Sequence, residues 1–361
     1  MKDTTDVTPS PVQRVTMDAI STQSAQATVH ANQSVNRIRR ITSQMKMLAL
    51  NAKIEAAKAG PFGRGFSVVA QEVGIVGDEI NGIAQDIQTE LTRRLSELAD
   101  MVTAMDHDTT GERLVDLAFT SVDTIDRNLY ERTCDVRWWA TDSSFVTALT
   151  DPSQSNLHFA GQRLGVILDA YNIYLDLWVC DTQGRILANA RPQKFNVTGA
   201  SVRDLTVFQA ALAQSSGDDF VAGDAMCAPL LQDRQVTYYA CAIRENGDKH
   251  GRIIGVMITC FDWEPQARSV VSSVRMDDSM VRNKTRLLLV DRKNRVIAAS
   301  DGRGFMVESI TFPADADPVA GFFRQHGKLV AYHETEGFET YKGLGWKGVV
   351  TQDIPQDKLA D

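Results

Sequence analysis

The residue types that usually perform catalysis or hold metals are scattered in this sequence. Its six histidines are isolated, and its five cysteines show neither a C-x-x-C pair nor the spacing of metal ligands. We also find no nucleotide-binding glycine loop and no nucleophile with a base placed beside it. We therefore expect no catalytic residue, no metal site, no cofactor and no enzymatic activity. The odd number of cysteines is typical of reduced thiols in a cytosol.

The composition is that of an ordinary soluble protein with more than one domain. Of the 361 residues, 43% are hydrophobic and 23% are charged. A net charge of −8 disfavours binding to the phosphates of nucleic acids. No run approaches the roughly 20 apolar residues of a membrane-spanning helix, and the first residues lack the pattern of a signal peptide. These features predict a cytoplasmic protein without membrane insertion.

Two heptad patterns on either side of a glycine-rich turn predict an antiparallel helical hairpin over residues 12–108. The first pattern contains Met17, Ile20, Ser24, Ala27, Ala31, Ser34, Ile38, Ile41, Met45, Leu48 and Ala52. The second contains Phe66, Val69, Val73, Val76, Ile80, Ile83, Ile87, Leu91, Leu95, Leu98, Val102 and Met105. Glycines and a proline within residues 58–66 permit the reversal between them.

One hairpin cannot bury all of this apolar surface, so we expect a homodimer in which two hairpins form a four-helix bundle. The heptads alone would favour a simple dimerisation stalk. Residues 1–11, which precede the pattern, are expected to be disordered.

From about residue 109 the pattern changes to mixed helices and strands. We expect a long connecting helix over residues 109–150, a further helix over 158–171, and strands at 174–180, 185–190, 236–243, 252–261, 286–290, 295–299, 328–333 and 347–352. Residues 175–189 and 285–299 echo each other as strand, turn and strand, with Asp181 and Asp291 at equivalent turn positions. The fold class is thus predicted to be α+β and multidomain. Its two similar α/β modules span residues 151–275 and 276–361.

Residues 47–73, which read MLALNAKIEAAKAGPFGRGFSVVAQEV, closely resemble the signalling tip of methyl-accepting chemotaxis proteins. In that family the tip forms dimers, which gather into trimers of dimers and contact a coupling adaptor and a chemotaxis histidine kinase. By this resemblance, the partner-binding residues are Leu50, Asn51, Glu55, Lys58, Val68, Val69 and Glu72, and the turn glycines are Gly60, Gly63 and Gly65. The sequence departs from the family pattern at Ser43, Lys58 and Pro61, and no methylation-site pattern is evident.

The second half resembles a double Cache sensor, in which a long helix leads into two PAS-like modules. A single large PAS-like or GAF-like module is the alternative. In double Cache sensors the first module usually holds the ligand. By this resemblance, the candidate ligand-binding residues are Tyr238, Arg244, Asp262 and Trp263, with Asp219 or Asp224 from the preceding loop.

Each candidate also has a structural interpretation. Asp262 could instead cap a helix over residues 264–274, and only one of Tyr238 and Tyr239 is expected to face the core. An aspartate beside aromatic rings could bind an amine, whereas an arginine could bind a carboxylate. Four residues on the long helix, Arg137, Trp138, Trp139 and Asp142, are unusual and could have a role in the pocket. The two adjacent tryptophans are expected to point in different directions, one onto the sheet and one to a dimer interface.

Together these features favour a cytoplasmic, chemoreceptor-like transducer that binds an unidentified small molecule in its carboxy-terminal half. Ligand binding would shift the connecting helix and so bias the hairpin tip. The alternative is a non-catalytic scaffold or adaptor, in which the hairpin docks onto receptors or a kinase without ligand control.

Overall fold

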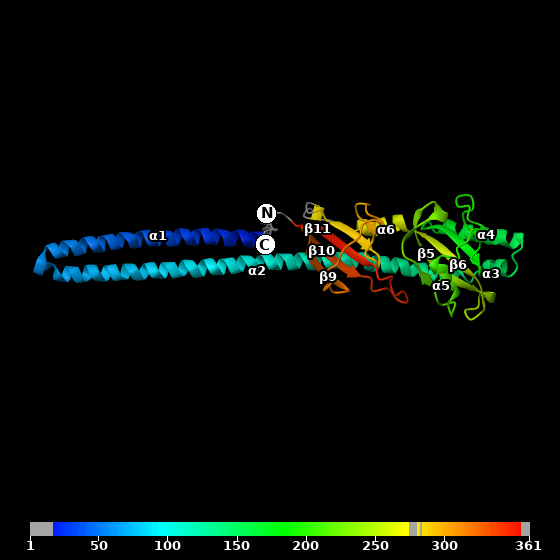
Figure 1. Ribbon diagram of the computed structural model, residues 1–361, viewed down its shortest axis with the longest axis horizontal. Coiled ribbons are helices and arrows are strands. Elements are labelled where there is room, and N and C mark those ends of the chain that lie inside the picture. Colours follow the sequence, from blue (N-terminus) through cyan, green and yellow to red (C-terminus); the bar gives the residue numbers. More distant parts are fainter. Residues whose placement is uncertain (1–16, 274–279, 282–283, 355–361) are drawn as a thin grey trace, which may run out of the picture. The chain divides into compact units, whose positions relative to one another are not determined.

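The computed structural model describes residues 17–273, 280–281 and 284–354 (Figure 1). The stretch 1–11, for which we expect disorder, lies outside the described residues. The chain divides into two units, Met1–Thr110 and Gly111–Asp361. Among the helices described, none has both the length and the apolar character needed to cross a membrane.

The first unit is the predicted helical hairpin. Helix α1 (Met17–Lys58) is followed by a short 3-10 helix (Gly60–Gly63) and then by α2 (Arg64–Trp139), which runs back beside α1 (Figure 1). Gly60 has a φ of 57°, a conformation that glycine adopts without strain. A Cβ atom on Gly63 would lie 2.0 Å from the carbonyl oxygen of Ala56, so only glycine fits there.

Gly65, which we assigned to the turn, lies inside α2 instead. It has no positive φ, and a Cβ atom at this position would meet open space. The reversal is therefore made by Gly60 and Gly63. The turn prediction is wrong at Gly65 because the return helix already begins at Arg64.

The two arms pack through small residues rather than through the large apolar side chains of the predicted heptad patterns. The buried positions repeat every seven residues and are Val35, Thr42, Ala49 and Ala56 on α1, and Ala70, Gly77 and Ala84 on α2. Small side chains at these positions let the helix axes approach closely. The larger residues next to them, such as Ile41, Leu48 and Ile83, remain exposed.

Polar contacts join the same two arms. Gln88 donates a hydrogen bond to Asn32 (3.2 Å), and Lys46 forms an ion pair with Asp78. The predicted pattern was therefore correct in its period but not in which of its positions face the partner arm.

The helix expected over residues 109–150 is two helices in the structure. Helix α2 ends at Trp139, and α3 (Ser143–Thr150) begins after a short break. The carboxylate of Asp142 accepts a hydrogen bond from the backbone N–H of Ser144 (2.9 Å), which makes it the N-cap of α3. An aspartate capping residue adopts an extended backbone, and this interrupts the helix.

The second unit contains two antiparallel sheets. The first has the order β2-β1-β6-β5-β3, with β4 also pairing with β5, and the second has the order β8-β7-β11-β10-β9. The first sheet consists of β1 (Tyr174–Asp181), β2 (Ile186–Asn189), β3 (Val221–Ala222), β4 (Met226–Ala228), β5 (Arg234–Arg244) and β6 (Ile253–Asp262). The second consists of β7 (Arg286–Val290), β8 (Val296–Ala299), β9 (Ala320–Gln325), β10 (Lys328–Glu334) and β11 (Lys347–Asp353). The predicted α+β fold class with two similar modules is confirmed.

The similarity between the two modules extends to individual hydrogen bonds in their strand–turn–strand segments. In the first turn, Oδ1 of Asp181 accepts hydrogen bonds from the backbone N–H groups of Gln183 and Arg185. In the second, Oδ1 of Asp291 accepts them from the N–H groups two and four residues further on. Both turns connect the outermost strand pair of their sheet. The duplicated sequence pattern therefore corresponds to a duplicated topology.

Both faces of the first sheet are covered. Helices α2, α3 and α4 (Gln154–Ala170) share a core cluster with Tyr239, whereas α5 (Thr206–Leu212) and the loop before it share a separate cluster with Tyr238. Both tyrosines are consequently buried. The expectation that only one of them would face a core is wrong because it assumed one solvent-exposed face.

Candidate functional site

The residues assigned to the signalling tip lie at the surface of the hairpin. Leu50, Val68 and Val69 are more than half exposed, although they are apolar. The polar members Asn51, Glu55, Lys58 and Glu72 are exposed as well. Exposed apolar side chains mixed with charges are typical of a protein-binding surface.

An ion pair links two of these residues. Lys58 Nζ lies 2.7 Å from Glu55 Oε1, and both side chains are about 70% exposed. A surface pair of this kind stabilises a helix by only about 0.5 kcal/mol. A partner protein can therefore replace it at little cost.

Sequence reasoning missed Phe62 as a surface residue of the tip. This side chain is 95% exposed and lies in the short 3-10 helix at the reversal. The available signal was a large apolar residue placed between glycines, where no core position is expected. Phe66, which we had placed in a heptad pattern, is also exposed.

The four candidate ligand residues do not line one pocket. Arg244 pairs with Ile253 at one end of the β5–β6 ladder, and Asp262 pairs with Val236 at the other end. At about 3.3 Å per residue, the two positions on β5 are roughly 25 Å apart. Asp262 is held in an ion pair with Arg234 (3.0 Å).

The aromatic candidates are core residues. The rings of Tyr238 and Trp178 lie 5.6 Å apart within the cluster under α5. Trp263 donates a hydrogen bond from Nε1 to the carbonyl oxygen of Ile297 (2.6 Å) and packs against Trp346. Trp263 thereby joins the two modules, and its role is structural.

The two loop aspartates, Asp219 and Asp224, also accept hydrogen bonds from other residues of the chain. Asp224 accepts a hydrogen bond from Trp346 Nε1 (3.0 Å), which again joins the modules. Asp219 accepts hydrogen bonds from the backbone of Ser216 and from Ser215 Oγ within its own loop. Of the six candidates, Arg244 is the one that lies in the wall of a pocket described below.

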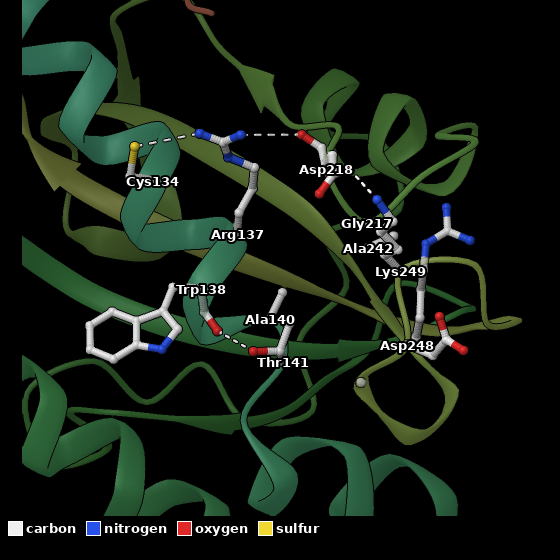
Figure 2. Close-up of a pocket in the computed structure, with 12 residues that line it drawn as sticks. Cys134, Arg137, Trp138, Ala140, Thr141, Gly217, Asp218, Ala242, Asp248 and Lys249 are labelled. Atoms are coloured by element: carbon white, nitrogen blue, oxygen red, sulfur yellow. Dashed lines mark hydrogen bonds and ion pairs between the residues drawn. The ribbon is translucent and has the colours of Figure 1, made fainter.

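Figure 2 shows this pocket, which has a volume of about 370 Å³. The last turns of α2, the end of β5 and two loops form its walls. Its lining includes Cys134, Arg137, Trp138, Asp218, Arg244 and Lys249. The volume lies within the range of about 300–1,000 Å³ that is typical of small-molecule sites.

The adjacent tryptophans at the end of α2 point in different directions, as predicted. Trp139 is buried and packs edge-on against Tyr171 and Tyr174, the second of which lies on β1. Trp138 is 70% exposed and lines the pocket.

The two arginines of the pocket are bonded to neutral acceptors. Arg137 donates from Nε to the carbonyl oxygen of Thr133 (2.9 Å) and lies above the ring of Phe220. Arg244 is only 7% exposed and donates to the carbonyl oxygens of Gln214 (2.7 Å) and Gly251 (2.8 Å). Among the described residues, no carboxylate lies within ion-pair distance of either guanidinium.

A second hollow of about 610 Å³ lies between α4 and β2. Its lining is rich in amide side chains, including Gln154, Gln162 and Asn189, and carries no acidic or basic side chain apart from His158. This hollow offers hydrogen bonds without a fixed charge.

A buried carboxyl group lies where the two modules meet. Asp126 on α2 accepts a hydrogen bond from the backbone N–H of Gly337 (2.7 Å) through Oδ2. Its Oδ1 is buried without a hydrogen-bond partner in the described structure, as are the hydroxyl groups of Tyr239 and Tyr341. Burial, opposed by the hydrogen bond from Gly337 and assisted by the nearby carboxylates of Asp123 and Glu336, raises the pKa of Asp126 to about 6.

The amino-terminal part of the chain is similar in sequence to known proteins. Residues 10–136 match the family model of the methyl-accepting chemotaxis protein (MCP) signalling domain. This part of the sequence is therefore similar to chemoreceptor signalling domains. A segment of the chain is 38% identical over 95 residues to the biofilm dispersion protein BdlA of Pseudomonas aeruginosa, covering 26% of this chain and 23% of that protein. It is 48% identical over 69 residues to the methyl-accepting chemotaxis protein TlpB of Bacillus subtilis, covering 17% and 10%. The chain therefore spans less than a quarter of the length of either relative.

Solved structures match the carboxy-terminal part. The sensor domain of the V. cholerae histidine kinase DctB has a TM-score of 0.50 and 12% identity, covering 68% of this chain and all of that one. The sensory domain of the Campylobacter jejuni chemoreceptor Tlp3 (CcmL) has a TM-score of 0.50 and 15% identity, covering 71% and 97%. The second unit of this chemoreceptor-like chain therefore has the fold of such sensory domains, as the double Cache resemblance implied.

Proposed function

We propose that the chain is a non-enzymatic, cytoplasmic transducer that binds a small molecule in residues 111–361 and signals through the hairpin tip. Its partners would be a chemotaxis histidine kinase and its coupling adaptor. The observation that supports this best is the combination of a signalling-domain match with a tip whose apolar and charged residues are all exposed. Helix α2 contributes residues to both units and is the connection through which we propose that the signal passes.

A homodimer is part of this proposal. Ile41 and Leu48, one heptad apart on α1, and Ile83 on α2 are exposed in the single hairpin and form an uncovered heptad stripe on each arm. Burial of apolar surface stabilises association by about 25 cal/mol per Å². A second hairpin would cover these stripes in a four-helix bundle, and such dimers could assemble further into trimers of dimers.

The test is capture of purified adaptor and kinase by the full chain. Glu55→Ala removes a charge at the tip, so we expect it to reduce capture at least about tenfold, as is common for a central interface residue. Glu79→Ala is the matched control because Glu79 is exposed on α2 outside the tip. Equal capture by the wild type and Glu55→Ala would contradict a tip-mediated contact.

A further inference from the structure

The pocket at the end of α2 contains positive charge that the protein itself does not neutralise. Arg244 is nearly buried, and its two hydrogen bonds go to backbone carbonyl groups. Its Nε is buried without a hydrogen-bond partner in the described structure. A buried charge that lacks a counter-ion is costly unless a further group compensates it.

The other charged groups of the lining do not supply that compensation. Asp218 forms an ion pair with Lys249 (3.1 Å), and both side chains are more than half exposed. Asp248 accepts a hydrogen bond from the backbone N–H of His250. The lining thus carries three cationic and two carboxylate side chains, and the excess positive charge resides on Arg137 and Arg244.

The remaining lining is largely apolar and aromatic. Ala140, Ala242 and the exposed ring of Trp138 form parts of the wall. Figure 2 shows Arg137 reaching from α2 toward Asp218, with Trp138 following it on the same helix. A pocket that combines apolar walls with a few charged groups favours ligands in which a group of opposite charge is attached to an apolar body.

We infer that this pocket binds a small monocarboxylate with an apolar or aromatic body. The carboxylate would receive hydrogen bonds from Arg137, and Arg244 would add electrostatic attraction from within the wall. The apolar body would lie against Trp138 and the alanines. This inference rests on the proposed sensory function and names the ligand class for it.

The position of the pocket gives such a ligand a route to the signalling domain. Arg137 and Trp138 belong to the last turn of α2, whereas Arg244 belongs to β5. A carboxylate between them would attract the end of the helix toward the sheet. A ligand that binds one arrangement of α2 more tightly than another shifts the equilibrium between them.

The test uses the full chain and benzoate as the probe, followed by calorimetry and tryptophan fluorescence. All five tryptophans are described, and Trp138 alone is exposed, so a benzoate-dependent change in emission reports on this pocket. We expect a dissociation constant below about 1 mM. Benzamide, which has the same shape without the charge, should bind at least about tenfold more weakly.

Variants locate the site. Arg137→Gln should weaken benzoate binding about tenfold, and Trp138→Phe should abolish the fluorescence change. Arg268→Gln is the control because Arg268 is exposed on α6 (Trp263–Ser273), away from the pocket, and makes the same change of charge. Circular dichroism checks that each variant is folded.

The outcomes separate this inference from the proposed function. Absence of benzoate binding, equal binding of benzoate and benzamide, or an unchanged affinity in Arg137→Gln would each overturn it. Capture of the adaptor and kinase is measured on the same preparations without benzoate. Intact capture without benzoate binding would remove only the ligand assignment, whereas benzoate binding without capture would remove only the signalling role.

Discussion

At the scale of single residues, the buried carboxyl groups of this chain serve different purposes. Asp176 is fully buried and accepts five hydrogen bonds, among them those from Trp178 Nε1 and Asn189 Nδ2. Asp126 accepts one at Oδ2, and its Oδ1 has none in the described structure. The carboxylate of Asp176 is therefore compensated by hydrogen bonds from β1, β2 and the residues after β2, whereas Asp126 is poorly compensated as an anion.

Asp126 makes stability depend on pH. Because the folded-state pKa of about 6 lies above the ordinary value of 3.8, the folded protein holds this proton more tightly than the unfolded chain. The stability that the protonated carboxyl group of Asp126 contributes is fully present below about pH 4, and it is lost as the pH rises through about 6. Wild-type stability should therefore fall relative to Asp126→Asn by at most about 3 kcal/mol between pH 4 and pH 8.

Urea unfolding at several pH values, followed by tryptophan emission, measures this difference. All five tryptophans lie in the second unit, so the signal is specific to it. Parallel pH dependences for the wild type and Asp126→Asn would show that the carboxyl group of Asp126 titrates normally.

At the scale of elements, the hairpin depends on close approach at its reversal and along its seam. Gly63 contacts the backbone of Ala56, and Gly77 lies against the side chain of Lys46. Small residues bury little area per layer, so each layer contributes less than a layer of leucines would. The two arms are therefore held together by many packing layers that each contribute little stability. The contact between Gly63 and Ala56 at the tip helps to fix the register of α1 against α2.

Gly63→Ala should separate the two arms near the tip. The added Cβ atom would overlap the carbonyl oxygen of Ala56, and overpacking of this kind usually costs about 1–3 kcal/mol. Hydrogen exchange of the amides around residues 50–70 should become faster. Gly65→Ala is the control, since its Cβ atom meets open space in a helix, and it should stabilise the hairpin by about 0.5–1 kcal/mol. Unchanged exchange in Gly63→Ala would contradict the close approach.

Most elements of the fold could be predicted from the sequence, because periodicity and turn chemistry act locally. The expected strands all form, whereas β3, β4 and β9 were not predicted. The segment Val221–Ala222 is too short to show an alternating pattern. The end of α2 was missed because we interpreted Asp142 as a possible pocket residue on a continuous helix, and the sequence does not show that it accepts a hydrogen bond from Ser144 as a helix cap.

The candidate sites could be predicted to different degrees. The tip residues were assigned together because they belong to one contiguous motif, and their role in partner binding stays a prediction. The pocket joins Arg137 to Arg244 from elements more than 100 residues apart, and sequence spacing carries no information about such a meeting. The sequence made Trp263 and Asp262 plausible ligand contacts. In the structure, Trp263 donates a hydrogen bond to Ile297 and Asp262 forms an ion pair with Arg234.

At the scale of the whole molecule, we expect self-association through the uncovered heptad stripes. Ile83 is half exposed in the single hairpin, so Ile83→Asp should not disturb the fold of one chain. In a four-helix bundle the same change would bury a charge and weaken the dimer at least about tenfold. Sedimentation at several concentrations measures this, with Gln85→Asp as the charge-matched control at an exposed position. A dimer that tolerates Ile83→Asp would place the interface elsewhere.

The exposed end of the hairpin has a practical consequence. Phe62, Phe66, Leu50 and Val69 keep large apolar areas in contact with water, and no described segment of the first unit covers them. Exposed apolar surfaces associate in water, so the isolated chain at high concentration should self-associate through the hairpin tips. A partner protein that covers this surface would then also keep the protein in solution.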